Sequence, residues 1–284
     1  MSSATGSAVL PPDRAGSPGS LIVSFAGSYL RELGGWIAVA DLIRCLRGVG
    51  LAEPAIRQAL LRLKSRGFLA AERRAGAAGY RLTEAGLRDL TTGDRRIFRQ
   101  ATTVLDDGWV LAVFSVPESD RHLRHRIRTE LSWLGFGTVS PGVWIAPRPL
   151  ADPTRELLVE AGLDGYVTWF AAHQLSVISV ADWWDLSALR AQYDGFLGEH
   201  RSAVGGGELR ADEAFAGYLT LIDSWRLFPR IDPGLPAALL PADWPAQHAW
   251  EVFWTLHQRW AGPGLEHVLD ICRGVTRRTA PAQR

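Results

Sequence analysis

The chain has 284 residues, 47% of them hydrophobic, with 31 basic and 30 acidic residues and a formal net charge of +1. This length suits two or three domains rather than one small core. No hydrophobic run is long enough for a membrane span, and the N-terminus lacks the basic start of a secretory signal. The two cysteines are too few for a disulfide framework or a cysteine metal site. We therefore expect a cytoplasmic protein.

The charges are unevenly distributed along the chain. Residues 1–100 carry +7 (15 basic and 8 acidic residues), whereas residues 101–284 carry −6 (16 basic and 22 acidic residues). A basic head before an acidic body is expected where only one domain meets a polyanion, and chance clustering on a solvated surface is the alternative.

The first elements of the chain are a tail and two helices. Residues 1–17 are rich in small residues, proline and glycine, and we expect a disordered tail there. Apolar residues at helical spacing then predict one helix over residues 18–33 and a second over 39–46, each followed by a glycine-containing turn. A third helix begins at Glu53, just before Pro54, because proline is well tolerated at a first helical position.

The third helix has two different faces. Its apolar residues at positions 56, 59, 60 and 63 form one stripe that must face the core. The opposite face is polar, and no acidic residue follows Glu53 until Glu72. A helix of this kind suits the major groove of DNA, which admits a helix and repels carboxylates. The residues that we expect to face DNA are Arg57, Gln58, Leu61, Arg62 and Ser65.

A hairpin is expected after this helix. Residues 68–72 predict a strand, residues 73–79 a glycine-rich loop and residues 80–83 a second strand, before a further helix that Thr83 caps. The whole of residues 18–92 therefore predicts a winged helix-turn-helix domain that binds DNA. Arg73 and Arg74, at the base of the wing, are candidates for phosphate contacts. Winged helices also bind proteins, so a protein–protein adaptor remains an alternative function.

The middle of the chain predicts a small mixed domain. After a linker over residues 93–104, residues 105–180 show the order β-α-β-β-α-β, which is that of the ferredoxin-like unit. In its first helix His122 and His125 are spaced three apart, but four arginines surround them. This cationic setting favours a solvated surface over a metal site.

The C-terminal region, residues 181–284, predicts a helical domain. Helical patterns begin after residue 181 and cover residues 212–228 and 245–260, with a proline-rich segment over 229–245. Tryptophan is dense here, which usually means a structural core. Arg226 and Arg230, beside Trp225 and Phe228, instead suggest a pocket with aromatic walls and cationic groups.

Several motifs carry a resemblance to known families. The segments "VFSVPE", "LSWLGFG", "PGVWIAPR" and "DSWRLFPRIDPGLPAALLPADWP" resemble those of the PaaX family of bacterial repressors, in the same order, over roughly residues 18–265. The segment "PAIRQALLRLKSRGFL" resembles the recognition segment of GntR-type repressors, with Arg57 at the DNA-contacting position and Glu53 where that family usually has a basic residue. The resemblance implies a repressor of aromatic-acid catabolic genes, and we expect it to bind its operator as a homodimer. It also implies release from the operator by an aryl-acyl-CoA thioester such as phenylacetyl-CoA, which Trp225, Arg226, Phe228 and Arg230 are candidates to bind.

The middle domain also resembles the small nuclease subunit of CRISPR spacer acquisition, so a metal-dependent nuclease is another alternative. Such a nuclease holds its divalent metal with an aspartate at the end of the first strand. Here Phe114 and Ser115 end that strand without a carboxylate. We therefore expect no catalysis, no metal and no cofactor, and a use of this domain in forming dimers. The expected fold class is α+β, with a winged helix-turn-helix, a ferredoxin-like domain and a helical C-terminal domain.

Overall fold

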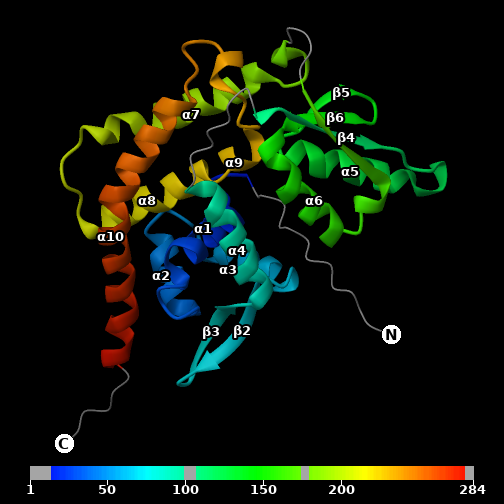
Figure 1. Ribbon diagram of the computed structural model, residues 1–284. Coiled ribbons are helices and arrows are strands. Elements are labelled where there is room, and N and C mark those ends of the chain that lie inside the picture. Colours follow the sequence, from blue (N-terminus) through cyan, green and yellow to red (C-terminus); the bar gives the residue numbers. More distant parts are fainter. Residues whose placement is uncertain (1–13, 99–106, 174–178, 279–284) are drawn as a thin grey trace, which may run out of the picture. The chain divides into compact units, whose positions relative to one another are not determined.

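In the computed structural model, the described residues are 14–98, 107–173 and 179–278, without the side chains of Arg95, Arg96, Arg230 and residues 274–278. The chain forms two compact units (Figure 1). The head unit draws on Val9–Phe98, Phe196–Leu227 and His248–Arg284, and the sheet unit on Arg99–Gly195 and Phe228–Gln247. Helices and two small antiparallel sheets confirm the α+β class. Among the described helices, none has the length and hydrophobicity to cross a bilayer.

The head unit begins with a helix that changes its geometry. The α-helix α1 (Pro18–Phe25) continues as a π-helical segment (Ala26–Leu30), where the sequence predicts one regular helix to residue 33. Most of the predicted tail lies outside the described residues. Its end does not, because the Ser17 side chain caps α1 and the Gly16 N–H donates to Asp223 Oδ2 (2.7 Å). The structured head therefore starts before residue 18.

The next elements form a three-stranded sheet with two helices. They are β1 (Trp36–Ala38), α2 (Val39–Arg47), α3 (Glu53–Ser65), β2 (Leu69–Arg74) and β3 (Ala77–Leu82), with the antiparallel strand order β1-β3-β2. The short strand β1 is not predicted by the sequence. The loop predicted over residues 73–79 is wrong, because the hairpin turns over Ala75 and Gly76 alone. Both have positive φ (46° and 81°), as a two-residue hairpin turn requires.

The helix α4 (Glu84–Ile97) follows, and Thr83 caps it as predicted by accepting the Gly86 N–H at 2.9 Å. The helix reaches beyond residue 93, so the first residues of the predicted linker are helical. Of the remainder of that linker, residues 99–104 lie outside the described residues.

The sheet unit contains the elements predicted for the middle domain, in the predicted order. They are β4 (Trp109–Phe114), α5 (Arg121–Trp133), β5 (Gly137–Ser140), β6 (Val143–Pro147), α6 (Ala151–Glu160) and β7 (Val167–Ala172). The sheet order is β5-β6-β4-β7, with antiparallel neighbours. Alternate residues of β4, such as Ala112 and Phe114, form one core with Ile127 and Leu131 of α5. On the other face Trp109 packs in a second core.

The C-terminal helices are α7 (Leu186–Val204), α8 (Ala211–Trp225), α9 (Phe228–Ile231) and α10 (Ala246–Arg278). The sequence ends the last of these at residue 260, but α10 continues through Pro263. A proline inside a helix removes a hydrogen bond and costs roughly 3 kcal/mol. Packing beyond the proline offsets this cost, since Val268 is fully buried and Gly264 lies directly against Tyr29 and Phe215.

Candidate nucleic-acid interface

The helix α3 separates a buried stripe from an open face. Ile56, Ala59, Leu60 and Leu63 are at most 2% exposed, as the sequence predicts. Leu61 on the other side is 60% exposed, which is unusual for a large apolar side chain unless it meets a partner. The candidate DNA-facing residues are all exposed: Arg57, Gln58, Leu61, Arg62 and Ser65.

The polar groups on this face are held only by their own helix. Arg57 Nε and Nη2 donate to Glu53 Oε1 at 2.9 and 2.7 Å, and both side chains of this ion pair are substantially exposed. The Ser65 hydroxyl donates to the Arg62 carbonyl at 2.8 Å. Arg62 itself forms no ion pair within the described part of the chain. Exposed ion pairs contribute only about 0–1 kcal/mol, so Arg57 can exchange Glu53 for a phosphate or a base at little cost.

The two candidate arginines of the hairpin, Arg73 and Arg74, differ in their contacts. Arg73 Nη2 donates to the Gly76 carbonyl at 2.6 Å, within the hairpin turn. Arg74 pairs with Glu72 at 2.5 Å and lies over the Trp36 ring at 5.5 Å. Glu72 also pairs with Arg81 at 3.0 Å. Arg74 is therefore tied to the sheet, whereas the hydrogen bond of Arg73 lies within the hairpin turn.

The aromatic residues predicted to bind a ligand are core residues. Trp225 is 5% exposed, stacks on Phe253 with ring centroids 4.5 Å apart, and donates its indole N–H to the Ile97 carbonyl at 3.1 Å. Phe228 is also 5% exposed and stacks on Tyr193 with centroids 4.3 Å apart. The packing explains both rings without a ligand.

Arg226 takes part in a buried hydrogen-bond cluster. Its side chain is 9% exposed, and its Nε and Nη2 donate to Asp223 Oδ1 (3.2 Å) and to Ser20 Oγ (2.6 Å). Asp223 also accepts the hydroxyls of Ser20 (2.6 Å) and Ser24 (2.7 Å) and the Gly16 N–H (2.7 Å). This cluster joins α8 to α1, so Arg226 has a structural partner.

The four ligand candidates are not brought together as one described site. Trp225 and Arg226 belong to the head unit and Phe228 to the sheet unit, while the side chain of Arg230 lies outside the described residues. No observation tests ligand binding by these residues, which stays a prediction. The contacts of Arg226 favour its structural role.

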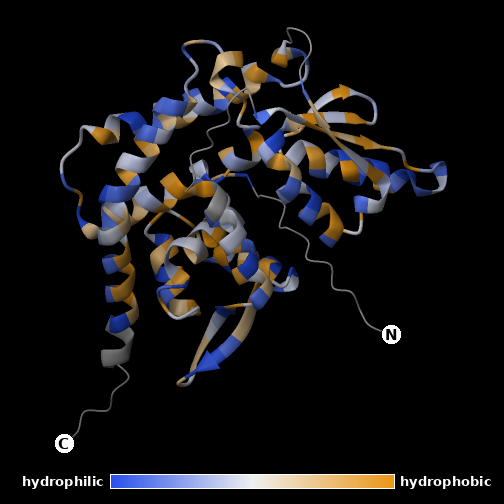
Figure 2. Ribbon diagram, in the orientation of Figure 1, coloured by the Kyte–Doolittle hydropathy of each residue, from blue (hydrophilic) through white to orange (hydrophobic). Residues whose placement is uncertain are grey.

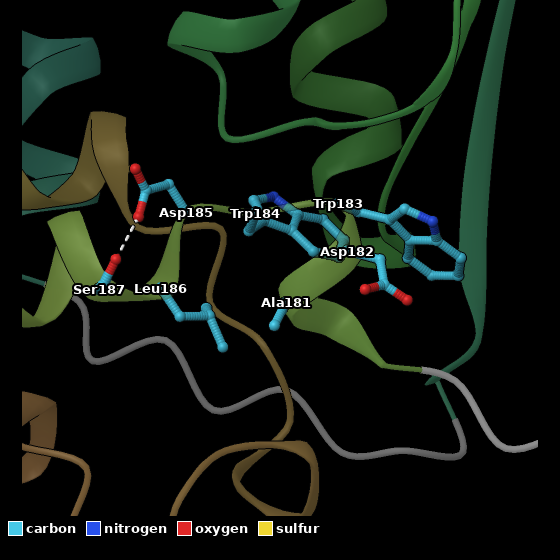
Figure 3. Close-up of a pocket in the computed structure, with 7 residues that line it drawn as sticks. All are labelled: Ala181, Asp182, Trp183, Trp184, Asp185, Leu186 and Ser187. Carbon is cyan, nitrogen blue, oxygen red and sulfur yellow. Dashed lines mark hydrogen bonds between the residues drawn. The ribbon is translucent and has the colours of Figure 1, made fainter.

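A pocket that the sequence does not predict lies in the sheet unit (Figure 3). It is lined by the continuous segment 181–187, including the indoles of Trp183 and Trp184, whose ring centroids are 6.1 Å apart. The backbone N–H of Ala188 and a neighbouring hydroxyl donate to Asp185 and lower the pKa of its carboxyl. This pocket offers aromatic surface beside carboxylates, which is unfavourable for an anion. The adjacent tryptophans are the sequence signal that could have indicated it.

The position important for a nuclease holds no carboxylate. Ser115 follows β4 directly, is exposed, and donates its backbone N–H to the Tyr166 carbonyl at 3.4 Å. His122 and His125 are exposed on α5. In the described ranges, no group of three or more histidine, cysteine or acidic residues is placed to hold a metal ion.

Comparisons with known proteins cover most of the chain. Three family models match it, described as PaaX-like protein (residues 17–86), PaaX protein central Cas2-like domain (102–182) and PaaX-like protein C-terminal domain (184–270). The chain is 31% identical over 263 residues to the transcriptional repressor PaaX of Escherichia coli (strain K12), covering 88% of this chain and 83% of that protein. It is also similar to the solved structure of an uncharacterised protein from Mycobacterium tuberculosis, with a TM-score of 0.58 and 23% identity over 88% of this chain and 97% of the other. At that identity the second likeness concerns the fold alone.

Proposed function

Because the chain belongs to the PaaX family of transcriptional repressors, we propose that it binds operator DNA through α3 and the β2–β3 hairpin of its head unit. As a member of this family it is a transcription regulator and not an enzyme. The observation that carries the proposal is the outer face of α3, which is exposed and non-acidic after Glu53 while its inner stripe is fully buried.

In this proposal, residues 18–92 act as a winged helix-turn-helix. The support is the order of α2, α3 and a tight hairpin, of which β3 pairs with β1. The helix α3 enters the major groove, and the hairpin lies along the backbone. A buried inner stripe holds α3 rigidly, which a recognition helix needs to present side chains to base edges.

Each exposed side chain of α3 has a matching chemical partner in DNA. Arg57 and Arg62 can donate two hydrogen bonds to guanine or to a phosphate, and Gln58 can pair with adenine. Leu61 can pack against a thymine methyl group, which would explain its exposure. Ser65 and, from the hairpin, Arg73 are suited to phosphate oxygens.

The sheet unit is proposed to form the dimer. Its β-α-β-β-α-β order and its sheet support a ferredoxin-like, non-catalytic domain over residues 105–180. The strands β5 and β7 are at the edges of this sheet, and Phe170 on β7 is 50% exposed. A symmetric dimer predicts an inverted-repeat operator with half-sites about one helical turn or a multiple apart, ~10 bp per turn. Sedimentation that finds a monomer bound to one half-site at full affinity would contradict this.

The effector is proposed from the family resemblance. An aryl-acyl-CoA thioester such as phenylacetyl-CoA would release the repressor from its operator in the cytoplasm. The predicted contacts in the helical domain (residues 181–284) remain Trp225, Arg226, Phe228 and Arg230. The alternatives, a metal-dependent nuclease or a protein–protein adaptor, predict DNA cleavage or an absence of DNA binding.

The decisive test is Arg57→Ala, measured by fluorescence anisotropy on a duplex that the wild-type protein enriches from random-sequence DNA. One lost base contact should cost about 1–3 kcal/mol, or roughly tenfold to a hundredfold in affinity, with little change on a scrambled duplex. Arg201→Ala removes an equally charged, exposed arginine from α7 and is the matched control. Wild-type affinity of the Arg57 variant for the enriched duplex would mean that α3 is not the recognition helix.

Glu53→Gln tests the same interface, but it is expected to raise the affinity for DNA instead of lowering it. The substitution removes a carboxylate from the proposed interface and frees Arg57 from its ion pair. Affinity for both the enriched and the scrambled duplex should rise by a few-fold, because repulsion between a carboxylate and phosphates does not depend on sequence. A loss of affinity would show instead that Glu53 positions Arg57 for DNA.

A further inference from the structure

We infer that the outward face of α5 in the sheet unit is a second binding surface for the phosphate backbone of duplex DNA. This inference rests on the proposed function, because it adds a sequence-independent contact to the recognition by α3. It concerns Arg121, His122, His125, Arg126 and Arg128, a set that we call the α5 basic face.

The charge of α5 differs from that of the chain around it. Residues 101–284 carry a net charge of −6 with 16 arginines, and four of these arginines fall within the eight residues 121–128. No acidic residue lies between Asp120 and Glu130. The basic residues are therefore concentrated on one helix of an otherwise acidic region.

The helix presents these cations to solvent. Leu123, Ile127 and Leu131 pack into the core of the sheet unit. At about 100° per residue, Arg121, His122 and His125 point away from that core, with Arg126 and Arg128 on the two flanks. All the residues of the α5 basic face are exposed, and the hydrophilic residues of α5 can be followed in Figure 2.

The arginines of the face differ from their neighbour Arg124 in their contacts with the described residues. Arg124 Nη2 donates to the Val116 carbonyl (2.9 Å) and pairs with Glu118 (3.3 Å), which ties it to the start of the helix. Arg121, Arg126 and Arg128 form no ion pair with any residue that the structure describes. Three guanidinium groups thus remain available for an external anion.

The placement of these charges is unfavourable for the helix alone. The first turn of α5 holds no acidic residue, so Arg121 faces the positive end of the helix dipole, while Arg124 is paired with Glu118. Arg124 and Arg128 are also a like-charge pair at i,i+4, which destabilises a helix. A surface helix that served only solvation would gain from acidic residues at these positions. A bound polyanion removes both kinds of repulsion.

The shape of the surface favours a nucleic-acid backbone over a small anion. Arg121 and Arg128 are seven residues apart, or about 10 Å along the helix axis at ~1.5 Å per residue. The cations lie along two turns of an exposed helix, where they match a row of phosphates spaced along a strand. Arginine binds such oxygens through two hydrogen bonds at once.

The test compares two triple variants on a mixed-sequence duplex of about 60 bp, titrated between ~50 and ~200 mM salt. Arg121→Ala/Arg126→Ala/Arg128→Ala removes the arginines of the α5 basic face. Arg148→Ala/Arg155→Ala/Arg201→Ala removes the same charge from exposed positions elsewhere. Each lost phosphate contact lowers the slope of log K against log salt by ~0.9, so the α5 variant should lose about 2–3 and the control nothing.

Each outcome decides for or against the inference. Equal slopes for the two triple variants would overturn it while leaving recognition by α3 intact. An α5 variant that keeps its slope but loses release by phenylacetyl-CoA would assign the face to the phosphates of the thioester. If the wild-type protein binds neither this duplex nor an enriched one, both the proposed function and the inference fail. Should the alanine variant unfold, Arg121→Gln/Arg126→Gln/Arg128→Gln removes the same charge with longer side chains, and it is expected to lose the same slope.

Discussion

The helices α3 and α8 both place an arginine where the sequence suggests a function, and the structure treats the two differently. Arg57 on α3 is exposed and, among the residues that the structure describes, bonds only to Glu53, four residues away on the same helix. Arg226, directly after α8, is 9% exposed, pairs with the buried Asp223 three residues away, and also bonds to Ser20, 206 residues away. A buried arginine that also bonds to a distant segment holds the fold together. One whose partner is a neighbour on an exposed turn remains available for a ligand.

The difference can be expressed in energies. Exposed pairs such as that of Arg57 contribute about 0–1 kcal/mol. Breaking a buried pair by removing one partner costs about 3–5 kcal/mol, because the other charge stays buried and unpaired. Variants of the two helices should therefore separate cleanly into those that change DNA binding and those that change stability.

The largest effect is expected for Asp223→Ala. This variant leaves Arg226 buried without its carboxylate and removes the acceptor of Ser20, Ser24 and Gly16. The free energy of unfolding in urea should fall by about 3–5 kcal/mol. Glu53→Ala, which breaks the exposed pair of α3, is the control and should change it by less than about 1 kcal/mol.

A small loss in Asp223→Ala would break the comparison. If the free energy of unfolding fell by no more than in the control, Arg226 would not depend on Asp223 for its place. Arg226 would then return as a candidate for the phosphates of the thioester.

The sequence predicted these two helices unequally, for a physical reason. The buried stripe of α3 follows from a period of 3.6 residues, which is local and needs no knowledge of the rest of the chain. The partners of Asp223 are about 200 residues away, so no local pattern reveals them. The composition around Arg226, an arginine between aromatic residues, is the same for a pocket and for a core.

Other differences between prediction and structure have the same origin. The strand β1 has three residues and exists because β3 pairs with it, which a single segment cannot indicate. The helix α10 continues through Pro263 because its later residues pack against the head unit's other helices. In the sheet unit the order of elements was predicted well, since each strand and helix there has a strong period of its own.

Gly264→Ala tests the packing of the interior at a second point. Replacing a helical glycine with alanine usually stabilises a protein by up to about 1 kcal/mol. Here an added Cβ would lie 2.7 Å from Tyr29 Oη and 3.3 Å from Phe215 Cα, and Tyr29 is fully buried. We expect a loss of about 1–3 kcal/mol, as for overpacked cores. Gly198→Ala in α7, where nothing lies within 4 Å, is the control and should stabilise. Thermal unfolding gives the melting temperatures of both variants. Equal shifts would show that the residues around Gly264 rearrange to accommodate the added Cβ.

The smallest effects are expected for Arg73 and Arg74 of the hairpin. These adjacent residues again allow a loosely held arginine to be compared with one that the fold holds in place. Within the described part of the chain, Arg73 bonds only to the turn of its own hairpin, whereas Arg74 is held by Glu72 and by the Trp36 ring. Arg73→Ala should lower the slope of log K against log salt by ~0.9 for operator and scrambled duplexes alike, with little change in stability. Arg74→Ala should leave the slope unchanged and cost about 0.5–1 kcal/mol of stability, the range of an exposed cation–π contact. Anisotropy across a salt series and urea unfolding of the same samples measure both quantities. The opposite result would be a lower slope for Arg74→Ala and a lower stability for Arg73→Ala. In that case the ion pair of Arg74 in the free protein would not keep it from binding DNA. Contacts in the unbound state would then not identify the DNA-binding residues of this protein.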